Sequence, residues 1–324
     1  MRATRTAQFV ISIDVEMSWG AVHHGRPHDP GPYQLEREVV ADVLNAMEKH
    51  GIAATWAVVG HLFLAECSPL NGQKHPEVIR PDYPWLLDDW YELDPCLGVE
   101  EAPTWYGPDL IAAVRSCATP QEIGSHSFGH LIAGEPGCSV EAFRTDLAAC
   151  QAAADLSGVE LRSFVFPRNS VGHVDVLEDS GFIAFRGPTP GRFPELPPWR
   201  RRLLSAVDRI SPLPSATVSP TWLGGIANIP QTYLFNPDSK TARRAGTTIW
   251  STLVRRRLRH AVRTSSLFHM WFHTHNLATR PDRARAAMDA LFAEARTYID
   301  AGRLENLTMG QLADRMGSSH GSSS

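Results

Sequence analysis

Short, mainly apolar runs alternate along this chain with longer segments of helical periodicity, and this alternation limits the folds open to it. The run QFVISIDV at 8–15 is rich in β-branched residues and ends in a charge, as expected of a buried parallel strand. Apolar residues then recur at helical spacing from Glu36 to Lys49, and His50-Gly51 ends that segment. With the run IAATWAVVG at 52–60, these segments predict a strand–helix–strand unit.

The same alternation resumes farther along the chain. We expect later strands at EIGSH (122–126), SFVFP (163–167), GFIAFRG (181–187) and SLFHMWFHTH (266–275), with helices at 140–156 and from Pro281 to Gly302. Repeated buried strands and helices favour an α/β fold, either a (β/α) barrel or a doubly wound parallel sheet.

Two long segments interrupt the pattern, at about 65–109 and about 188–266. Loops of this length inside a compact domain usually act as lids or binding elements. We therefore interpret 1–316 as one domain with two insertions, and we predict that the small, polar segment 317–324 is a disordered tail.

Each insertion has a distinctive composition. The first contains the aromatic residues Trp85, Trp90, Tyr91, Trp105 and Tyr106, which could pack on a sugar ring or form a small satellite core. The second contains the clusters WRRRLL and RRRLRHAVR. These arginines could pair with a phosphate or make peripheral contact with an anionic membrane, but a solvated helix face is the favoured interpretation.

Charge and cysteine content exclude several classes of protein. A formal net charge of −4 over 324 residues disfavours a nucleic-acid partner. No apolar run has the length of a transmembrane helix or signal peptide, so we expect a cytoplasmic protein without an integral membrane segment. Five cysteines, with no CxxC spacing, argue against a disulfide framework and against a cysteine-based zinc site.

Two motifs carry potential metal ligands. Asp14 and Glu16, in SIDVEMSWG, follow a buried strand two residues apart, so both carboxylates can face the same way. His126 and His130, in GSHSFGH, are four residues apart and would share a face if this segment turned helically. Together they predict a site of two histidines and one carboxylate, with positions left open for water and substrate.

Two further motifs follow later apolar strands. Arg168, in SFVFPRNS, could hold Asp14 ionised and oriented. His273 and His275, in MWFHTHN, alternate at a strand end and point to one face, where a histidine could protonate a departing amine.

The order of these segments resembles the polysaccharide deacetylase family, also called carbohydrate esterase family 4, from about Gln8 to about Met316. ATWAVVG follows the acidic strand as the second strand, and ENLTMGQLADRM resembles the family's closing segment. The resemblance implies a distorted (β/α) barrel that hydrolyses N-acyl groups, acetyl or formyl, from amino sugars or sugar-containing biosynthetic intermediates. Asp-Val-Glu in place of adjacent aspartates suggests a divergent Asp-x-Glu branch.

The resemblance also implies roles for individual residues. Asp14 would be the base, and Arg168 would hold it. The metal ligands would be Glu16, His126 and His130. The general acid would be His273, with His275 as the alternative. The expected cofactor is one divalent ion, zinc first, with cobalt, nickel, iron or manganese as alternatives. We assign substrate contacts to Trp19, Asn169 and Asn276, which lie in the same motifs.

Two other functions remain open at this point. One is hydrolysis of a linear or cyclic amide that is not a sugar, and the other is a carbohydrate-binding protein that has lost catalysis.

Overall fold

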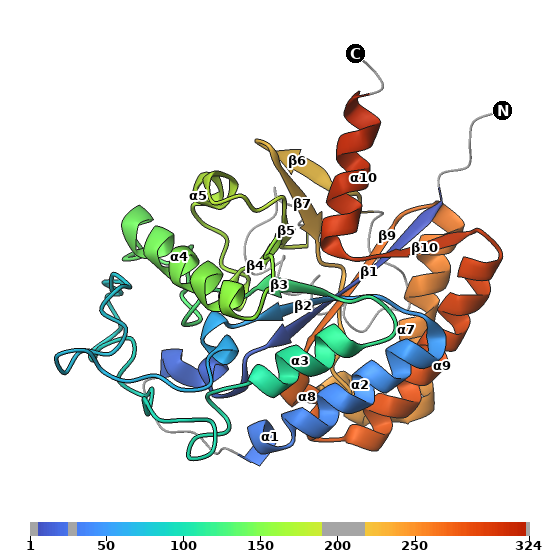
Figure 1. Ribbon diagram of the computed structural model, residues 1–324. Helices are drawn as coiled ribbons and strands as arrows, with labels where there is room; N and C mark the ends of the chain where they lie inside the picture. Colours follow the sequence, from blue (N-terminus) through green and yellow to red (C-terminus); the bar gives the residue numbers. More distant parts are fainter. Residues whose placement is uncertain (1–5, 25–30, 190–217, 322–324) are drawn as a thin grey trace.

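The strand β1 (Ala7–Val15) lies at the centre of the computed structural model, which describes residues 6–24, 31–189 and 218–321 (Figure 1). It pairs in parallel with β9 (Leu267–His273) along most of its length. Its other edge is shared by β10 (Leu304–Leu307) near the start of β1 and by β2 (Thr55–Val58) near its end. Nearly every β1 residue is buried, which explains the mainly apolar sequence of this strand.

The described strands form one ten-stranded sheet in the order β6-β7-β5-β4-β3-β2-β1-β9-β8, with β10 paired to β1. The remaining strands are β3 (Glu122–Ser125), β4 (Ser163–Val165), β5 (Ala184–Gly187), β6 (Thr221–Leu223), β7 (Ile226–Pro230) and β8 (Tyr233–Leu234). Neighbouring strands are parallel except for β6 and β7. The curled, mainly parallel sheet with helices around it confirms the prediction of a distorted (β/α) barrel (Figure 1).

The segment predicted as the second insertion contributes directly to this barrel. Strand β7 pairs with β5, and β8, only a few residues later, pairs with β9. Between them, Gln231 N–H donates to Gly187 O (3.0 Å) and Thr232 N–H donates to His269 O (2.9 Å). The chain from 226 to 234 thus connects the two ends of the sheet. The segment 188–266 is therefore only in part an insertion into the alternating pattern. The WRRRLL cluster at 199–204 is not among the residues that the structure describes.

Helices cover the sheet on both sides (Figure 1). Those expected from periodicity are found as α2 (Glu36–His50), α4 (Val140–Leu156) and α9 (Pro281–Asp300). The others are α1 (Gly31–Gln34), α3 (Pro108–Ser116), α5 (Val174–Asp179), α7 (Lys240–Thr264), α8 (Thr274–Ala278) and α10 (Met309–Gly321), with 3-10 turns η1 (Met17–His24), η2 (Gly60–Phe63) and η3 (Pro167–Asn169). Helix α10 extends into 317–324, for which composition predicted disorder. No helix among the described residues is long and apolar enough to cross a membrane.

The second arginine cluster lies on α7. The apolar face of this helix is buried through Trp250, Val254 and Leu258. Arg259, whose side chain is 43% exposed, pairs with Glu294 of α9. The favoured interpretation of a solvated basic face is therefore consistent with the packing of α7.

Candidate active site

The carboxyl ends of parallel strands bring the predicted site residues together. Asp14 is paired in register with His273 across β1 and β9, and Glu16 follows the end of β1. His126 follows β3, which reaches the same edge through β2. In a barrel of this type, this edge is where functional side chains gather.

The side chains of His126 and His130 both approach one carboxylate oxygen of Glu16. Glu16 Oε1 lies 3.1 Å from His126 Nε2 and 3.2 Å from His130 Nε2. His126 Nδ1 lies 2.7 Å from the carbonyl oxygen of Val165, which can only accept, so Nδ1 carries the proton. In the neutral ring, the Nε2 lone pair therefore faces a buried carboxylate, an arrangement that a cation between the two would stabilise.

The charge on Glu16 is well supported. Burial raises the pKa of Glu16, but His273 and His130 outweigh this effect and hold that pKa well below its ordinary value. An ionised carboxylate beside two histidines is a donor set suited to zinc or another transition-metal ion. These residues therefore fit the single divalent ion expected from the sequence.

The loop from His126 to His130 is not helical, in contrast to the geometry considered from its spacing. Ser127 and His130 have positive φ values of 69° and 62°, and such strained residues concentrate at functional sites. Asp146 of α4 holds the loop, because its carboxylate accepts the N–H groups of Phe128 (2.9 Å) and Gly129 (3.2 Å). Sequence reasoning missed Asp146, although a carboxylate on the apolar face of α4 was a usable signal.

Asp14 is held by a different arginine from the one expected. Arg186 Nη1 and Nη2 donate to the two carboxylate oxygens of Asp14 at 2.6 and 2.7 Å. Both side chains are almost fully buried, whereas Arg168 is exposed. The expectation that Arg168 orients Asp14 is therefore replaced by a pairing with Arg186 from β5.

Arg186 left a signal in the sequence that our interpretation did not use. It is the single charged residue in the apolar run GFIAFRG. A guanidinium inside a buried strand needs a paired carboxylate, so this position predicts an internal ion pair. Burial raises the pKa of Asp14, but Arg186, His273 and His126 together outweigh that effect and lower the pKa overall.

The two late histidines lie at different places in the site. His273 Nε2 is 3.4 Å from Glu16 Oε1 and 3.6 Å from Asp14 Oδ2, and its side chain is 24% exposed. Although burial lowers the pKa of His273, Glu16 outweighs it and raises that pKa to about 9. The ring of His275 is tilted by 36° against that of His273, with centroids 5.0 Å apart, and burial lowers the pKa of His275 to about 4. His273 is therefore the histidine beside the two acids.

The residues predicted to contact substrate have other neighbours. Trp19 is fully buried, with its ring 4.5 Å from that of His61 and its Nε1 donating to Trp105 O (3.2 Å). Asn169 Oδ1 accepts from Arg186 Nη2 at 3.2 Å, next to the Asp14 pair. Asn276 Oδ1 accepts from Asn236 Nδ2 at 3.4 Å. The packing of Trp19 is that of a core residue, which contradicts a direct substrate contact.

The aromatic residues of the first insertion mainly form a satellite core. Trp90, Tyr91 and Tyr106 are buried and Trp105 is partly buried, while Trp85 is exposed. Their packing leaves Trp85 as the member of this set most accessible to a sugar ring.

Solved structures share this architecture, whereas no family model and no curated sequence matches the chain. A protein from Mycobacterium smegmatis, provisionally named a polysaccharide deacetylase, is 15% identical with a TM-score of 0.63, over 99% of this chain and 93% of its own. A Pseudomonas aeruginosa PAO1 protein with the same provisional name is 12% identical with a TM-score of 0.60, over 96% and 91%. Puue allantoinase is 12% identical with a TM-score of 0.62, over 99% and 93%. The chain therefore has the fold of the polysaccharide deacetylases.

Proposed function

We propose that this chain is a metal-dependent hydrolase that removes an N-acyl group from an amino sugar. The observation that carries the proposal is the convergence of Glu16 with His126 and His130 beside the buried Asp14–Arg186 pair. A ligand set and an oriented carboxylate at the same end of a barrel are the two parts that hydrolysis of an amide requires.

Glu16, His126 and His130 would hold the ion. A divalent ion held there would polarise an acyl carbonyl and lower the pKa of the attacking water. Val165 O orients the ring of His126, and Asp146 orients the loop that carries both histidines. This support keeps the ligand atoms in place before substrate arrives.

Asp14 would accept the proton of the attacking water. Two hydrogen bonds from Arg186 keep this carboxylate ionised and fix its orientation. His273, which lies beside both acids and is partly exposed, would protonate the departing amine. The products are a carboxylate and a free amino sugar, so water supplies the atoms and no other reactant is needed.

The choice of an amino sugar rests on the resemblance of the motifs and on the fold shared with two proteins provisionally named polysaccharide deacetylases. Acetyl and formyl groups both present one carbonyl oxygen to such a site. The fold also supports a second candidate, since a protein named as an allantoinase matches with a similar TM-score. Hydrolysis of a cyclic amide is therefore the alternative to be separated by experiment.

The test is amine release from a panel of N-acetyl and N-formyl amino sugars, with simple linear amides and cyclic amides as comparators. We expect release from at least one sugar and a loss of about 100-fold or more in Asp14→Asn. Asp155→Asn, an exposed change on α4, is the matched control and should retain full activity. Turnover of cyclic amides with none of the sugars would contradict the proposed substrate class.

A further inference from the structure

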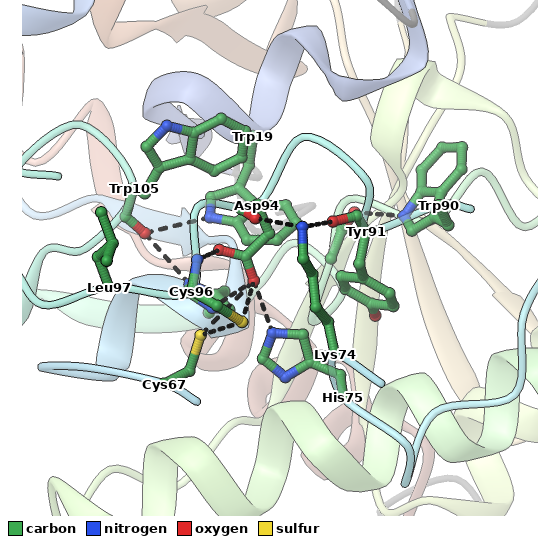
Figure 2. A network of polar contacts seen from close by, with 12 residues as sticks. Trp19, Cys67, Lys74, His75, Trp90, Tyr91, Asp94, Cys96, Leu97 and Trp105 are labelled. Atoms are coloured by element: carbon green, nitrogen blue, oxygen red, sulfur yellow. Dashed lines mark hydrogen bonds and ion pairs between the residues drawn. The ribbon is translucent and has the colours of Figure 1, made fainter. Parts of the chain in front are cut away.

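A second group of potential metal ligands lies in the first insertion, apart from the site described above. Figure 2 shows His75, Asp94 and Cys67 of this group and the contacts among them. Asp94 Oδ2 lies 2.7 Å from His75 Nε2, 3.3 Å from His61 Nε2 and 3.6 Å from Cys67 Sγ. One atom from each of the four residues lies within 4.8 Å of all the others.

One buried nitrogen of this group has no hydrogen-bond partner. The side chains of His61 and Asp94 are fully buried, and that of His75 is 6% exposed. His61 Nδ1 lies 3.2 Å from Trp105 O, which can only accept, so Nδ1 carries the proton. His61 Nε2 then points a lone pair towards Asp94 and has no hydrogen-bond partner. A buried nitrogen without a hydrogen-bond partner is unfavourable, and a bound cation would satisfy it.

Two of the other candidate ligands, Asp94 and Cys67, are also held by neighbouring groups. Asp94 Oδ1 accepts the N–H of Cys96 at 2.9 Å. Cys67 Sγ lies 3.3 Å from the hydroxyl of Tyr106. Contacts of this kind orient metal ligands in proteins and are part of a built site.

We propose that His61, Cys67, His75 and Asp94 form a structural zinc site. Two imidazoles, one thiolate and one carboxylate are ligand types that zinc takes in tetrahedral sites, and four protein ligands leave no position for a substrate. Binding releases the thiol proton of Cys67 to solvent. This site is independent of the proposed hydrolysis and uses none of its residues.

The spacing of these ligands explains why cysteine counting missed the site. The absence of CxxC spacing argued against a cysteine-based zinc site, whereas here a single cysteine joins two histidines and an aspartate at 61, 67, 75 and 94. Only the folded chain brings such irregularly spaced ligands together.

The position of the site gives it a role in the fold. Between η2 and α3, residues 65–107 contain turns and two isolated bridges but no helix or strand. Three of the ligands come from this stretch and His61 comes from η2, so the ion would fasten the insertion to the barrel. Trp90 Nε1, a few residues before Asp94, donates to Gly129 O (2.8 Å) in the loop that carries His126 and His130.

Cobalt substitution distinguishes the proposed zinc site from the Glu16 centre, because only the zinc site has a sulfur ligand, Cys67. Cobalt(II) added to the metal-stripped protein should give a near-ultraviolet sulfur-to-cobalt charge-transfer band in wild type and in His126→Ala. The band should be lost in Cys67→Ser and kept in Cys117→Ser, a thiol change at the end of α3. Wild type that binds cobalt without this band would overturn the assignment.

Two further measurements address the thiols and the folding of the variants. Cys67 Sγ and Cys96 Sγ are 3.0 Å apart, so intact mass after alkylation must show both as free thiols in protein purified with its metal. A disulfide between them would overturn the proposal. In His126→Ala, which lacks the other centre, a chelator should speed proteolysis within 65–107 several-fold, and an unchanged rate would also overturn it.

Discussion

Arg186 is the residue on which the charge of Asp14 depends, and this dependence can be tested by one substitution. Lysine at position 186 keeps a positive charge but loses the pair of hydrogen bonds at 2.6 and 2.7 Å. We expect Arg186→Lys to lower kcat/KM by about 100-fold through misplacement of the base. The acidic limb of the pH profile should move to higher pH, because the hydrogen bonds from Arg186 that lower the pKa of Asp14 are lost while burial still raises it.

Arg168→Ala is the matched control for this prediction. Its side chain is exposed, so its loss should leave both kcat/KM and the pH profile nearly unchanged. An equal loss of activity in the two variants would contradict the role assigned to Arg186.

Glu36 makes the stability of the protein depend on pH. Burial raises its pKa to about 8 from an ordinary value of 4.5, in spite of the hydrogen bond donated by Thr274. Between these values the folded state holds a proton that the unfolded state releases, so the free energy of unfolding falls as pH rises. This contribution to the free energy of unfolding is fully present below pH 4.5 and is lost as the pH rises through about 8.

Glu36→Gln should remove this contribution while keeping an acceptor for Thr274. Urea unfolding of both proteins at several pH values between 4.5 and 8 measures the difference. We expect the stability of wild type relative to the variant to fall by roughly 1.4 kcal/mol per pH unit in this interval. A constant difference would show that Glu36 does not titrate there.

At the scale of elements, α4 supports the metal centre through Asp146. Asparagine at this position has one oxygen and so cannot accept both N–H groups of Phe128 and Gly129 as the carboxylate does. We expect Asp146→Asn to weaken metal affinity at the Glu16 centre by about 10-fold, measured by titration of metal-stripped protein. Asp155→Asn, on the exposed side of the same helix, should bind the metal ion with wild-type affinity. Equal metal affinities in all three proteins would show that α4 does not support the metal centre.

The apolar face of helix α7 is buried in the protein, so this face is not available to insert into a membrane. Arg255 and Arg259 both reach Glu294 of α9, at 3.5 and 2.5 Å. We expect the double change Arg255→Gln and Arg259→Gln to leave sedimentation with anionic vesicles unchanged and to lower stability by about 1 kcal/mol or less. Vesicle binding that is lost in the double variant would instead support peripheral contact through α7.

Most elements could be predicted because their period is visible in the sequence. The apolar run of β1 and the helical spacing of α2, α4 and α9 gave bounds that agree closely with the structure. The short strands β7 and β8 were hidden inside a segment interpreted as an insertion, since strands this short lack a periodic signal. Their pairing with β5 and β9 depends on contacts distant in sequence.

At the scale of the whole molecule, the barrel determines which parts of the site could be foreseen. Ends of parallel strands meet at one edge, so Asp14, Glu16, His126 and His273 could be placed together from their motifs alone. Arg186 lies near the carboxyl end of β5 and obeys the same rule, but the sequence does not show which carboxylate it pairs with across the barrel interior. The same limit applies to the ligands in the first insertion, which no periodic element positions.

A catalytic ion held by Glu16, His126 and His130 should be visible in the metal content per chain, measured in wild type and in His126→Ala. We expect one metal ion fewer per chain in His126→Ala, together with loss of amine release. The control His260→Ala, a change on α7, should keep the wild-type metal content and activity. Equal metal content in His126→Ala and wild type would contradict the assignment of this centre.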